Sequence, residues 1–320
     1  MRLYGLPIWE IAQDLKSFDF SQTAYSSSVE KGYLLLNYFL SRRFADVHWL
    51  LFFFALIESV FVLVVLLKSD LKRFAWLGYL YYLFIFFPRS VNLIRQSLSF
   101  AILFVSSYFF LKRKWKPYFL FTTIAFCFHH SSVIAFAWPL MYWYMKGGNN
   151  KLKICSLFAL GALGIVSFKY WGFVMFYLGD KYSVYMDGTF KPHFTFFSLV
   201  NVPFILFFWT FFKSIKQKID YTIPLLSLLI VGFCCAQMSM ISVYLIRIST
   251  FFDLFLIWAA MIVWDFSKEN ILNKNKVTLV RLGLIFYPIL FFCGYYIYTG
   301  QNNICPYISE IFDQLWTSIL

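Results

Sequence analysis

The apolar residues of the chain form long runs that are separated by short polar connections. Eight runs have the length of a membrane-spanning helix, at roughly 49–67, 74–90, 91–111, 153–178, 196–212, 221–241, 243–264 and 279–299. A helix needs about 20 mostly apolar residues to cross a bilayer. Several runs are short or directly adjacent, so we expect some spans to tilt. The pattern predicts an all-α, polytopic transmembrane protein with about eight full spans.

The first 45 residues lack such a run. The stretch "EKGYLLLNYFLSRRF" (30–44) has apolar positions at helical spacing and a basic end, which is typical of an amphipathic helix that lies in the membrane interface. We therefore expect a single integral membrane domain over residues 1–320. Residues 1–45 would form an outer-face or interfacial segment, 46–300 the transmembrane bundle, and 301–320 an outer-face tail.

The composition and the basic residues support this interpretation and orient the spans. The chain is 61% hydrophobic and only 13% charged, and a soluble domain could not bury so much apolar surface. The basic residues gather in the connections 68–73, 111–116, 145–153, 213–218 and 267–276, and such connections stay in the cytoplasm. We interpret the net charge of +13 as this topology signal, and secondarily as affinity for anionic membrane lipids. We expect no nucleic-acid partner.

One apolar segment does not fit a topology in which successive connections alternate between the two sides of the membrane. Residues 117–145 are bounded by basic connections at both ends, so the chain has to leave and re-enter the cytoplasmic side within 29 residues. Two full spans would need about 40 residues. The pattern predicts a short broken-helix hairpin that turns at "HHSS" (129–132), enclosed by protein or facing a wet cavity. In the alternative, purely structural interpretation, Ser131 and Ser132 cap the second short helix.

Ionisable residues within the apolar runs indicate function, because burying them in a membrane is unfavourable. Between 89 and 106 the polar residues recur at offsets of three, four and seven, which predicts one polar stripe on a single helix. Its members are Arg89, Asn92, Arg95, Gln96, Ser99 and Ser106. Arg247 lies near the outer end of a later run. Guanidinium groups bind phosphates bidentately, so we expect a lipid-linked phosphate or pyrophosphate as ligand.

Each of these cations also has a structural interpretation. Arg89 could extend to the lipid headgroups, as could Lys191 in a predicted outer loop. The more enclosed arginines, at 95 and 247, could instead form ion pairs with Asp253 or Glu58.

Several chemistries lack their motifs. The chain contains no GxxxxGK[ST], no GxGxxG after a strand, no HExxH and no Asp-x-Asp dyad. His129 and His130 are adjacent and would point about 100° apart on a helix, so the two cannot hold one metal ion from one face. We expect no metal and no cofactor.

The segment from 92 to 144 resembles the central signature of the EpsG/Wzy-type polysaccharide polymerases. The matching positions are Ile94-Arg95-Gln96 at the start of a span and Phe128-His129-x-Ser131 after a basic loop. Weaker matches are Glu30-x-Gly32-Tyr33 and Arg247-Ile248. His130 falls on a variable position of the motif. The family usually has a span before the Glu-x-Gly-Tyr element, and this chain shows none there, so we expect a truncated start or a divergent member.

The resemblance implies an enzyme that joins polyprenyl-pyrophosphate-linked oligosaccharide repeat units at the outer, periplasmic face of the bacterial inner membrane. The product would be O-antigen, capsule or exopolysaccharide, and lipid pyrophosphate would be the leaving group. The implied partners are the lipid-linked oligosaccharide, the membrane lipids, a chain-length regulator and a flippase.

The resemblance also suggests roles for the polar residues. His129 is the leading candidate for the base that activates the acceptor hydroxyl, with Glu30 as a competing carboxylate. Arg95 and Arg247 are the candidate pyrophosphate clamp. The other candidates would bind substrate, as supplementary cations (Arg89, Lys191), orienting amides (Asn92, Gln96), a support for His129 (Ser131) and sugar-stacking rings (Tyr33, Tyr182, Tyr185).

Three other functions share parts of this pattern. A flippase or exporter of lipid-linked glycans would also need an outward basic cavity, although it should show internal repeats. An O-antigen ligase would share the leaving group and differ in its acceptor. A membrane acyltransferase could use a buried histidine as its base.

Overall fold

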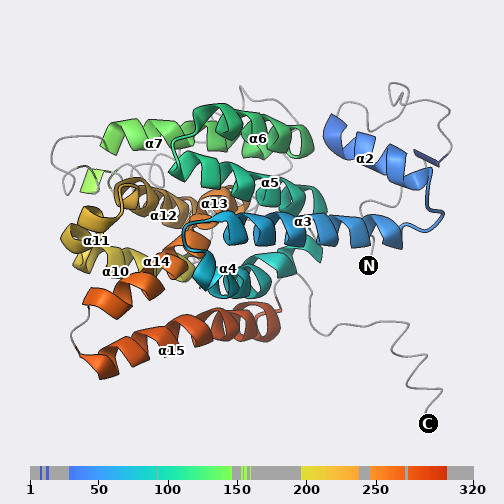
Figure 1. The fold of residues 1–320 in the computed structure, drawn as a ribbon. Coiled ribbons are helices and arrows are strands. Elements are labelled where there is room, and N and C mark those ends of the chain that lie inside the picture. Colours follow the sequence, from blue (N-terminus) through green and yellow to red (C-terminus); the bar gives the residue numbers. More distant parts are fainter. Residues whose placement is uncertain are drawn as a thin grey trace, which may run out of the picture.

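The computed structural model describes residues 29–91, 93–145, 196–237, 246–270 and 273–300, together with single residues between 8 and 13 and between 153 and 159. Every element in this part of the chain is helical (Figure 1). Most of the predicted span at 153–178 lies outside the described residues, as do the outer loop with Tyr182, Tyr185 and Lys191, the tail at 301–320 and Asn92.

Four described helices are long and apolar enough to cross a membrane: His48–Lys68, Ile94–Leu111, Arg247–Lys268 and Lys274–Tyr298. A fifth candidate is the pair Leu199–Thr210 and Phe212–Lys218, which is bent by 84° at its break. The protein is therefore a helical membrane protein with four to five candidate spans in its described part. The count of about eight spans stays a prediction.

The helices follow the predicted runs, with breaks that the pattern did not predict. Their bounds are α2 Lys31–Ser41, α3 His48–Lys68, α4 Ala75–Tyr81, α5 Ile94–Leu111, α6 Trp115–Phe128, α7 Trp138–Met145, α10 Val202–Thr210, α11 Phe212–Lys218, α12 Thr222–Gln237, α13 Ile246–Asp253, α14 Phe255–Asn270 and α15 Lys274–Phe291. Shorter 3-10 or π segments join them, namely η1 Lys72–Phe74, η2 Tyr82–Phe86, η3 Phe87–Val91, η4 His130–Ala137, η7 Phe196–Asn201 and η10 Phe292–Tyr298.

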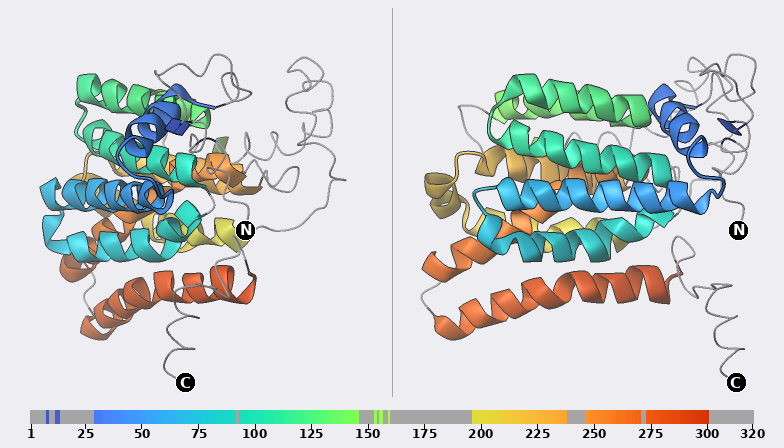
Figure 2. Two further views of the ribbon diagram at one scale, coloured as in Figure 1. Left: turned by 90° about the vertical axis from the view of Figure 1, so that its right-hand side faces the viewer. Right: turned by 45° about the vertical axis from the view of Figure 1, so that its right-hand side comes forward.

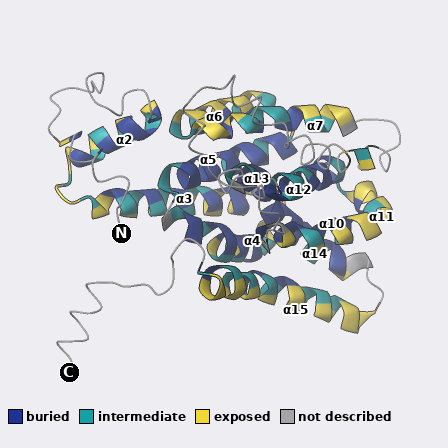
Figure 3. Ribbon diagram, turned by 180° about the vertical axis from the view of Figure 1, so that it is seen from behind, coloured by how far each residue is buried: buried dark blue, intermediate teal, exposed yellow. Residues whose placement is uncertain are grey.

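Helix α5 lies at the centre of the bundle, and most of its residues are buried (Figure 3). It packs against α6 through serines, whose small side chains allow two membrane helices to approach closely. The Ser99 hydroxyl donates to the Ala125 carbonyl at 3.1 Å, and the Ser106 hydroxyl donates to the Tyr118 carbonyl at 3.0 Å. The two helices run antiparallel, so residues earlier in α5 lie beside residues later in α6. Arg95, four residues before Ser99, therefore lies level with His129, four residues after Ala125.

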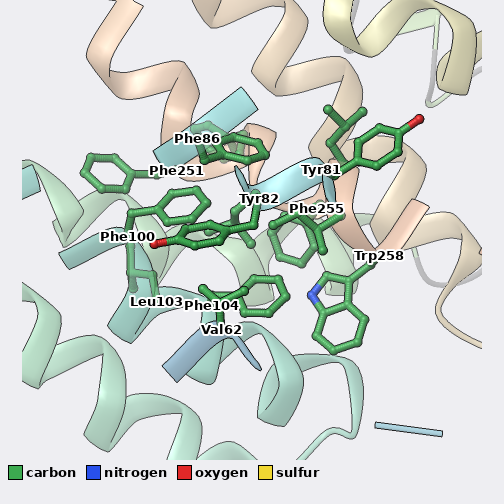
Figure 4. Packing of buried hydrophobic residues seen from close by; sticks show 14 of the residues in the cluster. Val62, Tyr81, Tyr82, Phe86, Phe100, Leu103, Phe104, Phe251, Phe255 and Trp258 are labelled. Carbon is green, nitrogen blue, oxygen red and sulfur yellow. The ribbon is translucent and has the colours of Figure 1, made fainter. Parts of the chain in front are cut away.

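The apolar core between α4, α5 and α14 is built of aromatic rings (Figure 4). Phe104 stacks on Trp258 with ring centroids 5.1 Å apart, and the Trp258 indole donates to the Ser107 hydroxyl at 2.9 Å. Phe86 stacks on Phe100 at 4.8 Å. Ring packing and hydrogen bonds stabilise the contact between these helices, because lipid provides little hydrophobic driving force for helix association.

The hairpin predicted for 117–145 is present. Helix α6 ends where His129 adopts an extended backbone (φ −156°, ψ 116°), and η4 and α7 then return along α6. The Tyr118 hydroxyl donates to the Ala135 carbonyl, and the rings of Trp115 and Tyr142 lie 6.0 Å apart. His129 occupies the position that precedes η4 and makes no side-chain capping bond, and Ser132 has no recorded hydroxyl partner. The interpretation of these serines as caps is therefore wrong.

Helix α2 lies across the end of the bundle where α3 and α5 begin (Figure 2). Tyr33, Leu34, Asn37 and Ser41 face the protein, whereas Leu35 and Phe39 are exposed. This division confirms the amphipathic helix predicted within 30–44.

The opposite end of the bundle, which we term the basic end, gathers the predicted basic connections. Ion pairs join them: Lys112 to Asp70, Arg73 to Asp265, and Arg113 to Asp220 at 3.7 Å. These pairs link the connections after α3, α5, α11 and α14, so four of the five basic clusters lie on one side.

The polar stripe predicted for 89–106 does not lie on one helix. Arg89 lies in the 3-10 segment η3, and Leu93 departs from helical geometry (φ −123°, ψ 46°) before α5 begins at Ile94. Arg89 and Arg95 therefore enter different environments. The prediction was wrong because spacing alone does not show a break between two helical segments.

Candidate active site at the start of α5

A glycine allows α2 to dock beside the turn of the α6 hairpin. A Cβ atom built on Gly32 would lie 2.7 Å from the backbone carbonyl oxygen of Cys127, closer than side chains approach backbone atoms. Only glycine permits this contact without a shift of one helix. The close approach places Glu30, the residue that precedes α2, next to the turn that follows α6.

Glu30 is the centre of the cluster and is only 5% exposed. Its Oε2 accepts a hydrogen bond from Arg95 Nη1 at 2.5 Å. Its Oε1 lies 3.1 Å from His129 Nδ1 and accepts from the His130 backbone N–H at 3.2 Å. One carboxylate thus joins the start of α2, the start of α5 and the turn of the hairpin.

The charges around Glu30 keep it ionised. Burial would raise the pKa of this carboxyl, but the hydrogen bond with His129 and the charge of Arg95 outweigh burial and lower the pKa from 4.5 to about 2. Glu30 is consequently an anionic hydrogen-bond acceptor at neutral pH and a weak base.

The two histidines have different places. His129 directs Nδ1 to Glu30, its ring lies 6.2 Å from that of Phe251, and its side chain is 18% exposed. When Nδ1 donates to a carboxylate, Nε2 carries the basic lone pair. His130 contributes its backbone N–H to the cluster, while its exposed ring lies beside Phe126.

Arg95 lies at the boundary between the cluster and the outside. Its side chain is 38% exposed, while Nη1 is held by Glu30. The guanidinium also lies 5.8 Å from the ring centroid of Tyr33. Tyr33 is buried, with its ring 5.6 Å from that of Phe54, so a sugar cannot stack on it in this arrangement.

Gln96 connects this cluster to α13. Its side-chain amide donates to the backbone carbonyl of Arg247 at 2.8 Å. Phe251, whose ring lies beside His129, is one helical turn after Arg247 and so on the same face of α13. The predicted positions Glu30, Arg95, Gln96, His129 and Arg247 therefore converge, although they come from four separate segments.

Arg89 is buried rather than extended to lipid headgroups. It is 6% exposed, donates to the Thr250 hydroxyl, and lies 3.6 Å above the centroid of the Phe197 ring. The headgroup interpretation is therefore wrong for this residue. Sequence reasoning missed both Thr250 and Phe197, because neither a threonine nor a phenylalanine stands out in an apolar run.

The predicted carboxylate partner of Arg95 is also wrong. We expected Asp253 or Glu58, but Arg95 pairs with Glu30. Asp253 instead accepts from the Asn201 amide at 2.6 Å and from the Ser249 hydroxyl at 2.9 Å. Proximity in sequence favoured carboxylates within the spans, whereas the real partner lies outside them, before α2.

Ser131 is exposed in the turn next to His129. Asn92, Tyr182, Tyr185 and Lys191 lie outside the described residues, so their predicted roles stay predictions. Within the described ranges, no three His, Cys, Asp or Glu side chains gather as metal ligands.

One comparison with known proteins found a match. A family model described as the EpsG family matches residues 8–309, nearly the whole chain. Searches among curated proteins and among solved structures found no match.

Proposed function

The chain belongs to the EpsG family, which supports a polysaccharide-polymerase role in a membrane, and on this basis we propose that it joins polyprenyl-pyrophosphate-linked oligosaccharide repeat units. The reaction would take place at the periplasmic face of the inner membrane and build O-antigen, capsule or exopolysaccharide. The contact of Glu30 with both Arg95 and His129 carries the proposal, because it combines an oriented histidine with a cation at one end of the bundle.

The proposed step is a glycosyl transfer. A hydroxyl oxygen of the incoming repeat unit attacks the anomeric carbon of the growing chain and forms the new C–O bond. The bond between that carbon and the pyrophosphate oxygen breaks, and the lipid pyrophosphate leaves with the electron pair. The hydroxyl proton goes to His129 Nε2, which is the unprotonated nitrogen when Nδ1 donates to Glu30.

The arginines would stabilise the leaving group. Negative charge grows on the pyrophosphate as the bond breaks, and guanidinium groups fixed in advance bind it best in the transition state. The side chain of Arg95 is partly exposed and so accessible to a ligand. Arg247 would supply the second cation, because Gln96 holds its backbone beside the start of α5. Glu30 is then a positioning residue rather than a base, since its pKa of about 2 makes proton abstraction unfavourable at neutral pH.

Reconstitution with purified lipid-linked repeat units tests the proposal. We expect polymer from the wild-type protein alone, and single repeat units on the lipid with His129→Ala or Arg95→Ala. Translocation without bond formation would instead identify a flippase, and transfer to lipid A a ligase. Dependence on an acyl donor would identify an acyltransferase.

A further inference from the structure

An apolar groove of about 210 Å³ lies between α4, α10, α14 and α15, away from the candidate active site. Its walls include Tyr81, Phe204, Phe207, Val263, Val280 and Tyr287. Gly283 also lines the groove, and a Cβ atom built there would meet no other atom within 4 Å. Open space thus remains next to α15.

The groove lies beside a candidate membrane span, so we expect it to face the lipid hydrocarbon. Helix α15 belongs to the candidate span Lys274–Tyr298, of which only 11% of the apolar window is buried inside the protein. Its outward residues Leu279, Leu282, Phe286 and Leu290 are exposed, as expected for a lipid-facing helix. An occupant of the groove must therefore be apolar along most of its length.

Cations lie at the end of the groove nearest the basic end. Lys276 precedes Val280 by four residues and Gly283 by seven, so it shares their face of α15. It is exposed and lies about 10 Å from Gly283 along the helix axis. On the facing side, Lys218 lies 6.0 Å from the ring of Phe266, which contacts Phe207 of the groove wall.

The described acidic side chains at the basic end are already paired. Asp70 pairs with Lys112, Asp265 with Arg73, and Asp220 with Arg113. Whatever contacts each of them makes, the described cations on the helices beside the groove outnumber these three acids; they are Lys213, Lys216, Lys218, Lys268, Lys274, Lys276 and Arg281. Positive charge therefore exceeds negative charge where the headgroup of a lipid in the groove would lie.

We propose that this groove binds an anionic diacyl phospholipid from the leaflet at the basic end. One acyl chain occupies the groove beside Gly283, and the phosphate lies near Lys276 and Lys218. Basic residues between membrane helices hold anionic headgroups in this way. The lipid differs from the glycan substrate, because the candidate active site lies at the opposite ends of the helices. The proposal does not depend on glycosyl transfer.

Native mass spectrometry of the purified protein tests this site, with phosphatidylglycerol and phosphatidylcholine of identical acyl chains as probes. We expect preferential retention of phosphatidylglycerol. Lys276→Gln should lower its affinity roughly fivefold and leave phosphatidylcholine unchanged. Gly283→Phe, which fills the groove, should lower retention of both lipids. Gly294→Phe is the matched control, because Gly294 lies further along the same helical span, also faces open space and does not line the groove.

Three results would overturn the proposal: equal retention of the two phospholipids, equal behaviour of Gly283→Phe and Gly294→Phe, or displacement of phospholipid by stoichiometric polyprenyl phosphate. The last result would assign the groove to the substrate lipid. If Gly283→Phe does not fold, Lys276→Gln still decides the question, because that side chain is exposed and its replacement disturbs no packing.

Discussion

Arg95 donates from Nη1 to Glu30 Oε2 at 2.5 Å, although the two residues are 65 positions apart in the chain. This ion pair fastens the amphipathic helix α2 to the first turn of α5, and the same carboxylate contacts His129. The positions of the Arg95 guanidinium and the His129 imidazole therefore both depend on the Glu30 carboxylate.

Glu30→Gln should reduce polymer formation by about 10²-fold, because the amide no longer favours the tautomer of His129 with a basic Nε2. The change keeps the shape of the side chain, so the protein should insert normally. The polymerisation rate measured against pH checks this. A positioning role predicts an altered pH profile as well as a lower rate. An unchanged profile and rate would exclude it.

His129→Ala should reduce the rate by about 10²–10⁴-fold, the usual contribution of a general base. The matched control is His130→Ala, because the His130 ring is exposed and only its backbone N–H meets Glu30. We expect His130→Ala to stay within a few-fold of wild type. Single-turnover product formation measures both variants, and similar rates in the two would contradict the assignment.

The stability of the α2 contact should depend on pH in a defined window. The pKa of Glu30 is lowered from 4.5 to about 2, so its stabilising contribution is fully present above about pH 4.5 and disappears as the pH falls toward 2. Glu30→Gln lacks this contribution. The difference in melting temperature between wild type and Glu30→Gln should therefore be constant from neutrality to about pH 4.5 and then shrink. A difference in melting temperature that increases on acidification would show that folding does not lower the pKa of Glu30.

Gly32→Ala should loosen α2, because the new methyl group would lie 2.7 Å from the Cys127 carbonyl oxygen. Overpacking of this kind destabilises by about 1–3 kcal/mol. Faster hydrogen exchange of the α2 amides would report the loss of docking. Gly294→Ala serves as the control, since its added Cβ meets nothing within 4 Å. Equal exchange in both variants would show that α2 docks without needing Gly32.

Hydropathy and charge correctly predicted the long apolar helices and the hairpin. Helices α3 and α5 follow their apolar runs closely. The α6 hairpin was predicted because basic residues flank a segment too short for two spans. Both features depend on local composition and on the thickness of a bilayer, which a single sequence is sufficient to evaluate.

Five of the predicted candidate residues lie close together, namely Glu30, Arg95, Gln96, His129 and Arg247, but their contacts were not predicted. Arg95, Arg247 and His129 were selected as polar residues within apolar runs, and the family resemblance added Glu30, but the partner of Arg95 was expected within the spans. The pairing depends on the close approach at Gly32 and on the register of Ser99 with Ala125. These are tertiary contacts, and no periodicity along the chain reports which carboxylate they bring to an arginine.

The length of α6 has a consequence for the surrounding lipid. Its 14 residues extend about 21 Å, whereas the hydrocarbon of a bilayer is about 30 Å thick. We therefore expect the turn that carries His129 to lie below the far headgroup plane, where lipid beside α6 would have to thin or dip to reach it. Such a depression would lower the phosphates of neighbouring lipids toward Arg95. Under the proposed function, a lipid-linked sugar diffusing in that leaflet would then meet the guanidinium without leaving the membrane.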